Sequence, residues 1–406
     1  MLGIMNMNSM TVAIVLGLVF LSCSEDDKRL AGKVEQQERS DISNSTLVVD
    51  MKKNVRESMK LSSLIKDVSY LELENVEGSF LYSPKNIKMV DSLLYILDIE
   101  NQLKCFKMDG TFVRDSYTIG HGPEEVAKLY DFDVDSLFLY LLDGASSAML
   151  QFEHDGTFVG RRKLPFLATR FKVLTSGSYL FELAPFTLDS SKENVQVVVT
   201  DSLFRIRNEY FEREDYSRVG MVTRTPYFEN STHSAYFAPI HRRGIYMLEN
   251  DHFYMKYYLD FDTPYYEPNR YFEGEQEAKT KGVFYTYENP FHTNRYLLQS
   301  FVTSVDLKGL FVMDLQTKQS MFIRHIENDM EDVINFDFRF TKFYDANRDL
   351  FVSTTDFYYT GMHTEDEINR ASEHLSEVTK KILIRSDQEE VNPILMFYRL
   401  QTDIVE

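Results

Sequence analysis

The chain has 406 residues, of which 43% are hydrophobic and 26% are charged, the composition of an ordinary globular protein. Its formal net charge of -19 at pH 7 argues against nucleic-acid partners, because phosphates require a surface rich in Lys and Arg. The same charge argues against electrostatic attraction to anionic lipid. The two cysteines, Cys23 and Cys105, cannot form an intrachain disulfide if Cys23 is modified.

The N-terminal segment combines an apolar run with a cysteine. The run, residues 11–21, is too short to span a bilayer, which takes about 20 residues, but it suits the core of a signal peptide. Ser22 and Cys23 follow, and this pattern resembles the bacterial lipoprotein box. We therefore expect a signal peptide over residues 1–22 and lipidation of Cys23, whose acyl chains would anchor the protein to a membrane. The alternative is a buried apolar helix with an incidental cysteine.

An acidic segment follows this cysteine. Ser-Glu-Asp-Asp at 24–27 is similar to the acidic export signal of surface-exposed lipoproteins of Bacteroidetes, although a charge run can also serve only to solvate a tether. Residues 23–45 are polar, charged and poor in aromatic residues, which predicts a flexible tether. The expected location is the cell envelope, with the protein anchored to the outer membrane and exposed at the cell surface.

Two segments repeat in the first half of the chain. In each, an apolar strand that ends in Asp, at 92–98 and 137–143, precedes Asp-Gly-Thr-Phe-Val, at 109–113 and 155–159. Asp-Gly favours the positive φ angles of a tight hairpin turn. A period of 46 residues with several strands per unit indicates the blades of a β-propeller. More diverged strand-rich units, which bring the total to about six, lie at 171–199, 244–258, 309–324 and 339–352.

Near the C-terminus the strand pattern is interrupted. Apolar residues recur every three or four positions from 368 to 382, and Thr364 with Glu367 forms a capping box. This predicts a helical insertion over about 364–384. The chain returns to a strand at 393–398. We expect the early strands 47–49 and 70–73 to pair with it, which would remove the open edge of the ring.

Four short motifs carry a family resemblance. They are Ser-Pro-Lys-Asn-Ile-Lys at 83–88, Gly-His-Gly-Pro-Glu-Glu at 120–125, Asp-Phe-Asp-Val-Asp at 131–135 and Val-Asn-Pro-Ile-Leu at 391–395. Together they resemble the six-bladed β-propeller lipoproteins of Bacteroidetes, which are related to NHL and TolB-type propellers. The resemblance implies an all-β fold, with a six-bladed β-propeller over residues 46–406, and an envelope location. It implies no particular activity, because propellers include both enzymes and binding proteins.

The Gly-His-Gly-Pro-Glu-Glu motif supplies candidate ligand-binding residues. It should link the outer strand of one blade to the inner strand of the next, on a face of the propeller near its axis. There His121, Glu124 and Glu125 could present an acid/base pair or bind a cation. The competing interpretation is a Gly/Pro turn with solvated charges.

Three alternating carboxylates, Asp131, Asp133 and Asp135, would share one face of a strand and could hold Ca²⁺. Ser136 stands where an EF-hand loop needs glycine. The favoured interpretation is therefore strand residues with a turn aspartate, and no metal site is predicted. Cys105 lies in an alternating strand, where a free cysteine usually acts as a small buried hydrophobe.

Tyrosine and phenylalanine are dense between residues 253 and 287. Exposed aromatic rings would suit stacking on sugars or contact with a partner, whereas packing between blades is the alternative. Tyr265, Tyr266 and Tyr271 lie near two prolines in the segment expected to be a loop. They are therefore the best candidates for exposure and ligand contact.

These features favour binding over catalysis. The sequence contains no nucleophile elbow, phosphate-binding loop or dinucleotide fingerprint, and no cofactor is predicted. The leading hypothesis is a surface lipoprotein whose propeller binds an extracellular glycan, peptide or outer-membrane protein partner. One alternative is a propeller hydrolase or lyase acting on an extracellular polymer, which would need carboxylates and histidines from several blades in one pocket. Another is a purely structural envelope protein.

Overall fold

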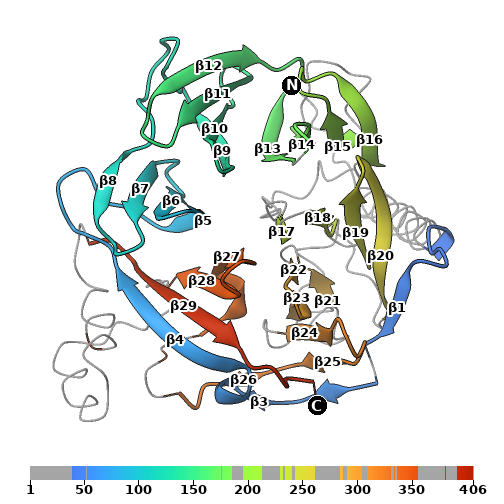
Figure 1. The fold of residues 1–406 in the computed structure, drawn as a ribbon. Helices are drawn as coiled ribbons and strands as arrows, with labels where there is room; N and C mark the ends of the chain where they lie inside the picture. Colours follow the sequence, from blue (N-terminus) through green and yellow to red (C-terminus); the bar gives the residue numbers. More distant parts are fainter. Residues whose placement is uncertain are drawn as a thin grey trace, which may run out of the picture.

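The chain forms a ring of β-sheets around a central axis (Figure 1). The computed structural model describes residues 39–51, 53–174, 176–184, 195–212, 229–231, 234–239, 243–260, 284–286, 290–303, 309–330, 333, 336–354, 380 and 391–405. Short 3₁₀ turns such as η1 (Leu61–Ser63) and η4 (Phe338–Phe340) connect some of the strands. Among the residues described, no helix has the length and apolar character needed to cross a bilayer.

The first three blades are four-stranded antiparallel sheets whose strands follow one another in the sequence, innermost first. Blade 1 contains β5 (Pro84–Val90), β6 (Leu93–Asp98), β7 (Leu103–Lys107) and β8 (Phe112–Asp115). Blade 2 contains β9 (Leu129–Val134), β10 (Phe138–Asp143), β11 (Ala148–Glu153) and β12 (Phe158–Lys163). Blade 3 contains β13 (Ala168–Val173), β14 (Tyr179–Leu183), β15 (Val195–Thr200) and β16 (Ile206–Glu212).

Blades 4 to 6 complete the ring and take strands from the N-terminal segment. Blade 4 contains β17 (Glu229–Ser231), β18 (Ser234–Phe237), β19 (Gly244–Glu249), β20 (His252–Asp260) and β1 (Leu47–Asp50). Blade 5 contains β21 (Phe284–Thr286), β22 (Phe291–His292), β23 (Tyr296–Thr303), β24 (Gly309–Asp314), β25 (Ser320–Ile323) and β2 (Val55–Arg56). Blade 6 contains β27 (Thr341–Asp345), β28 (Leu350–Thr354), β29 (Ile394–Leu400) and β4 (Ile65–Glu72). The short strands β3 (Met59–Lys60) and β26 (Ile326–Glu327) pair with each other, outside the six blades.

The prediction of a six-bladed, all-β propeller is confirmed.

The C-terminal strand closes the ring as predicted, because β29 pairs antiparallel with β4 and places Met396 opposite Tyr70. The prediction that the strand at 47–49 pairs with this C-terminal strand is wrong. That strand, β1, runs parallel to β20 in blade 4, with Val48 opposite Tyr258. An apolar strand can cover any exposed sheet edge, and this segment passes blade 4 before it reaches blade 6. From β1 to β4 the N-terminal segment therefore follows the outer edges of blades 4, 5 and 6 (Figure 1).

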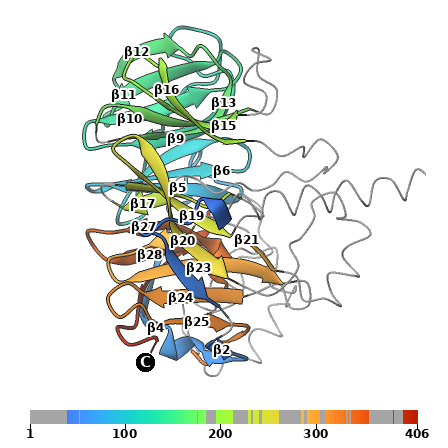
Figure 2. The ribbon, with the colours of Figure 1, turned by 90° about the vertical axis from the view of Figure 1, so that its right-hand side faces the viewer.

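The hydrophobic core lies between neighbouring blades. One cluster, for example, joins Ile87 and Leu94 of blade 1 to Val352 and Leu395 of blade 6. Seen from the side, the blades form a flat disc with its strands running across it (Figure 2). Since each sheet is covered on both faces by its neighbours, the polar groups of the inner strands are the ones that reach the axis.

Local details agree with the pattern of the sequence. Gly110 and Gly156 adopt φ angles of 87° and 97° in the two Asp-Gly turns, a conformation that favours glycine. Cys105 is fully buried in β7, as expected. Apart from Lys380, the helical insertion predicted over 364–384 lies outside the described residues, as do the signal peptide, Cys23 and most of the tether.

Candidate functional site

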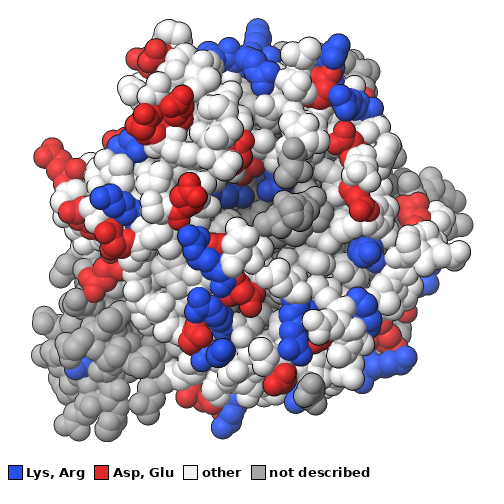
Figure 3. All heavy atoms as spheres, viewed as in Figure 1, with Lys and Arg blue, Asp and Glu red and all other residues white. Residues whose placement is uncertain are grey.

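A cavity of about 1150 Å³ lies at the centre of the ring, where the inner strands end. Blades 1, 2, 3 and 6 contribute the ends of β5, β9, β13 and β27 together with the turns that follow, and blade 4 contributes the turn between β19 and β20. Figure 3 views this face and shows it hollowed at the centre, with charged side chains both inside and around the hollow. The axial cavity therefore gathers residues from five blades.

The inner strands of blades 1 to 3 repeat one arrangement, in which a buried apolar residue has polar neighbours on both sides. The apolar residues are Ile87, Phe132 and Phe171. The residues that follow them, all of which line the cavity, are Lys88, Asp133 and Lys172. The residues that precede them are Asn86, Asp131 and Arg170. Charge at the wall of the cavity therefore alternates in sign from one blade to the next.

Asp133 connects blade 2 to both of its neighbours. Its Oδ2 accepts a hydrogen bond of 2.9 Å from the backbone N–H of Val173 on β13, which is the edge strand of its sheet. Its Oδ1 lies 3.9 Å from Nζ of Lys88. The two side chains are only 6% and 7% exposed, so this is a buried ion pair. Loss of either partner would leave an uncompensated buried charge, which is strongly destabilising.

Asp131 lies two residues earlier along β9 and is fully enclosed. Its Oδ2 accepts a hydrogen bond of 3.1 Å from the N–H of Phe171, and its Oδ1 accepts one of 3.3 Å from Nδ2 of Asn86. Burial raises the pKa of the Asp131 carboxyl to about 7, although the Phe171 N–H and the charges of Arg170 and Lys88 oppose the shift. This carboxyl therefore titrates near neutral pH.

Carboxylates outnumber cations in the lining of the axial cavity. The carboxylate residues are Asp91, Asp133, Asp135, Glu249, Asp251 and Asp345. The cationic residues are Lys88, Lys172 and Arg348. A concave, partly desolvated surface focuses the field of its charges, so this excess of carboxylates favours ligands that carry a cationic group.

Several of these carboxylates also hold the local structure. Asp135 accepts two backbone N–H groups in the turn after β9 and the hydroxyl of Tyr140, all at 2.8 Å. Asp345 pairs with Arg348 at 2.5 Å, and Asp251 pairs with an arginine of β16 at 3.4 Å. Because these groups are already engaged, the arrangement suits the binding of polar groups better than proton transfer by a carboxyl.

The loop at 120–125 lies at the opposite end of β9 from the cavity, because it leads into the first residue of that strand. Within it, Oε2 of Glu125 accepts a hydrogen bond of 2.8 Å from the N–H of Gly122. Arg161 of β12 donates to the carbonyl of Glu125 and to Oδ2 of Asp143, both at 2.7 Å. His121 and Glu124 are exposed, whereas Glu125 is half-buried. None of the three lines the axial cavity.

The other candidate residues from the sequence do not gather at one point. Asp131 and Asp133 bond to different groups of β13, and Asp135 caps a turn. Within the part of the chain that the structure describes, no three His, Cys, Asp or Glu residues are grouped so that they could hold a metal ion. Tyr265, Tyr266 and Tyr271 lie outside the described residues.

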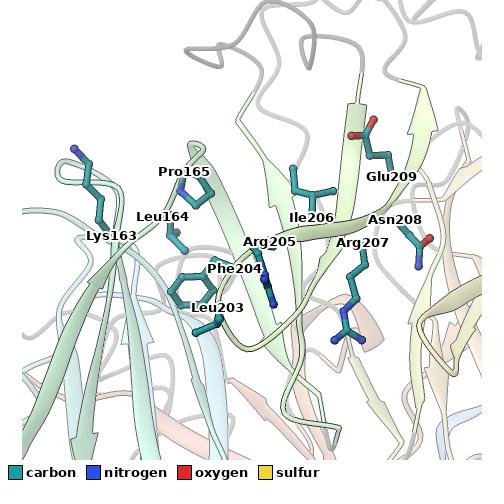
Figure 4. A pocket seen from close by; sticks show the side chains of 10 residues that line it. All are labelled: Lys163, Leu164, Pro165, Leu203, Phe204, Arg205, Ile206, Arg207, Asn208 and Glu209. Carbon is teal, nitrogen blue, oxygen red and sulfur yellow. The ribbon is translucent and has the colours of Figure 1, made fainter.

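A second hollow, of about 1060 Å³, lies on the rim of the ring between blades 2 and 3 (Figure 4). The segment after β12 forms one wall, and the turn before β16 forms the other. Arg162 lies over the ring of Phe204, 4.3 Å from its centroid, and Leu203 is 64% exposed. This rim groove is built from neighbouring segments of two blades, whereas the axial cavity draws on five.

Sequence reasoning singled out Asp131 and Asp133 but missed Lys88 and Lys172. The two lysines share a sequence feature, because each follows a buried apolar residue that has a polar neighbour on either side. This feature becomes visible only when the three inner strands are aligned on Ile87, Phe132 and Phe171. The repeats used for prediction begin at 92 and 137, after the inner strands, so they did not include these positions.

Comparison with solved structures agrees with the architecture. A Bacteroides fragilis protein described as exported has a TM-score of 0.66 at 19% identity, covering 88% of this chain and 99% of that one. A DUF4221 family member from Bacteroides vulgatus has a TM-score of 0.47 at 8% identity, covering 83% and 97%. Virginiamycin B lyase from Staphylococcus aureus has a TM-score of 0.35 at 14% identity, covering 63% and 73%. The first similarity shows a shared fold, and the two weaker ones support no argument about function.

Comparison at the level of sequence assigns a family. No curated protein matches the chain. The model of a family described as a domain of unknown function, DUF4934, matches residues 46–399. This span runs from the start of β1 almost to the end of β29, so it includes nearly the whole propeller. The chain belongs to the DUF4934 family.

Proposed function

We propose that the protein is an exported lipoprotein whose propeller binds an extracellular glycan, peptide or outer-membrane protein partner. Lipidation of Cys23 would anchor it to the outer membrane, and residues 23–45 would let the propeller face the cell's surroundings. The apolar run and the acidic segment on either side of Cys23 support this location. The similarity to a Bacteroides protein described as exported is consistent with it.

The axial cavity is the observation that carries the binding function. Its volume of about 1150 Å³ is comparable to the upper end of small-molecule sites, which span about 300–1,000 Å³. Polar residues of five blades converge on it, although they are far apart in the sequence. Such convergence positions groups for recognition on rigid strands rather than on a single loop.

A hydrolase or lyase acting on a polymer is the competing function, and the cavity favours it less. An acid/base site needs a carboxyl or histidine that is available to the substrate. Asp133, Asp135, Asp251 and Asp345 already accept hydrogen bonds or ion pairs from the protein. No histidine is present among the cavity-lining residues that the structure describes.

Thermal unfolding of a soluble form that begins after Cys23 tests the binding function. The protein would be scanned against neutral oligosaccharides, short peptides and divalent ions. A ligand at about 100 times its dissociation constant adds roughly 2.7 kcal/mol to stability. We expect at least one class to raise the melting temperature, and the increase should be lost when Lys172 is replaced by Gln. A ligand whose effect is unchanged by Lys172→Gln would place binding outside the axial cavity.

The lipid anchor has a separate test. In the full-length precursor, Cys23→Ser should move the protein from the membrane fraction to the soluble fraction, because the acyl chains supply the attachment. Ser22→Thr, which keeps the cysteine and a small preceding residue, serves as the control. Membrane association that survives Cys23→Ser would show that another segment attaches the protein.

The loop at 120–125 and the aromatic segment provide further proposed contacts. His121, Glu124 and Glu125 would meet a macromolecular partner on the face opposite the axial cavity. Tyr265, Tyr266 and Tyr271 would supply aromatic contacts to the same class of partner. Cross-linking in intact membranes with photoreactive residues at 121 and 265 would test these contacts, and products identical to those of an uncross-linked control would contradict them.

A further inference from the structure

Two lysines of the axial cavity lie deeper than two of its carboxylates, although the buried Asp133 and Asp345 and the more exposed Arg348 do not follow this order. Lys88 is buried, with 7% of its side chain exposed, and Lys172 of β13 is half-buried. Asp91, in the turn after β5, and Glu249, at the end of β19, are exposed. Figure 3 shows blue atoms recessed in the central hollow, and both red and blue atoms on the blades around it. A ligand that enters therefore passes Asp91 and Glu249 before it reaches the two ammonium groups.

The deep ammonium groups suit an anionic group of a ligand. Nζ of Lys88 lies 3.9 Å from Oδ1 of Asp133, at the outer limit of a direct ion pair, while the N–H of Val173 occupies Oδ2. A lysine ammonium has three donors, so a carboxylate in the cavity can bond to it while the pair with Asp133 persists. Such a charge-assisted bond is stronger in a partly desolvated cavity than in water.

The exposed carboxylates suit a cationic group. An ammonium group held at the mouth would lie near Asp91 and Glu249. Arg348, which donates to the carbonyl of Asp91, is there already paired with Asp345. A polyanion would be repelled at the mouth, and a polycation would be repelled by the lysines at the floor. A neutral sugar would use neither charge. The arrangement best fits a small molecule that carries one charge of each sign at its two ends.

We propose that the axial cavity binds a short peptide with free termini, with its carboxylate on Lys88 and Lys172 and its amino group near Asp91 and Glu249. This inference rests on the proposed binding function and specifies the class of ligand. Lys88 and Asp91 are three residues apart, which corresponds to about 10 Å if the rise of β5 is continued into the turn that begins at Asp91. An extended tripeptide has about this length.

Isothermal titration with trialanine in four forms tests the proposal. The forms are the free peptide, the N-acetylated peptide, the C-amidated peptide and the peptide blocked at both ends. The free form should bind most tightly. Blocking either end should weaken binding by about tenfold, because each block removes one charge-assisted contact.

Variants then assign each end of the peptide. Lys172→Gln should abolish the preference for a free carboxylate and leave the preference for a free amino group. Asp91→Asn combined with Glu249→Gln should have the reverse effect. Asn tolerates the φ angle of 50° at Asp91, and these side chains are exposed or half-buried, so the fold should persist. Lys107→Gln, at the exposed end of β7 and outside the axial cavity, is the matched control and should change neither preference.

Equal affinity for the four forms, or unchanged discrimination in Lys172→Gln, would overturn the peptide proposal. Binding of a neutral oligosaccharide that is weakened by Lys172→Gln but not by Lys107→Gln would also overturn it, while the cavity would stand as the binding site. Failure of all four peptides to bind would overturn the peptide proposal alone. The proposed function would fail only if the thermal scan found no ligand and cross-linking in membranes found no partner.

Discussion

The axial cavity and the loop at 120–125 contain the same kinds of charged residue, but they differ in what those residues contact. In the cavity, charges from different blades face one another, and Lys88 and Asp133 are paired in a buried position. In the loop, His121 and Glu124 are exposed, and the buried interactions are those of Arg161 with backbone carbonyls. The contiguous motif at 120–125 is thus a turn that the protein stabilises. The axial cavity has no contiguous motif, because its residues come from several blades.

The largest expected effect is the loss of the buried pair in the cavity. Asp133→Ala would remove the carboxylate that faces the Lys88 ammonium and leave the N–H of Val173 without this acceptor. Removal of one partner of a buried pair typically costs about 3–5 kcal/mol. Urea unfolding should show this loss of stability. The double variant with Lys88→Met should recover part of it, and equal stabilities of the single and double variants would contradict the pairing.

The next effect is the pH dependence that Asp131 gives to stability. Its folded pKa is raised to about 7 from the ordinary 3.8, so the folded protein holds this proton more tightly than the unfolded chain does. The contribution of this group is therefore full below about pH 4 and is lost as the pH rises to about 7, by about 4 kcal/mol. Unfolding measured across this range should show the decline in wild type. Asp131→Asn should remove this component, and an unchanged slope would contradict the assignment.

The loop should depend on Arg161 more than on its own charged residues. Arg161→Ala would remove the hydrogen bonds to the carbonyls of Gly122 and Glu125 and the pair with Asp143. We expect a loss of about 2 kcal/mol, since hydrogen bonds to charged groups are worth about 1.5–3 kcal/mol. Arg161→Lys keeps the charge but not the forked geometry and should show an intermediate loss. No loss in either variant would show that the loop holds its own shape.

The smallest effect belongs to the exposed residues of the loop. His121→Ala and Glu124→Ala should each change unfolding free energy by no more than about 0.5 kcal/mol, because neither side chain is buried. Neither substitution should weaken binding of a small ligand, since both residues lie outside the axial cavity. A marked loss of ligand affinity in either variant would show that the loop, and not the axial cavity, binds the ligand.

The fold could be predicted because its signals are local. Asp-Gly turns at 109 and 155 and the apolar strands before them mark the blades, and an apolar C-terminal strand marks the closure. The partner of β1 could not be predicted, because a short apolar strand fits several sheet edges. The cavity was missed for a related reason. Lys88 and Lys172 line a cavity whose other walls come from blades that are distant in the sequence, whereas the loop at 120–125 is contiguous.

Hydrogen–deuterium exchange with and without free trialanine would locate the binding site within the propeller. If the axial cavity is the binding site, protection should appear at the ends of β5, β9 and β13 and in the turn at 249–251, while the loop at 120–125 remains unchanged. Protection confined to residues 120–125, with no change at the inner strands, would contradict the account.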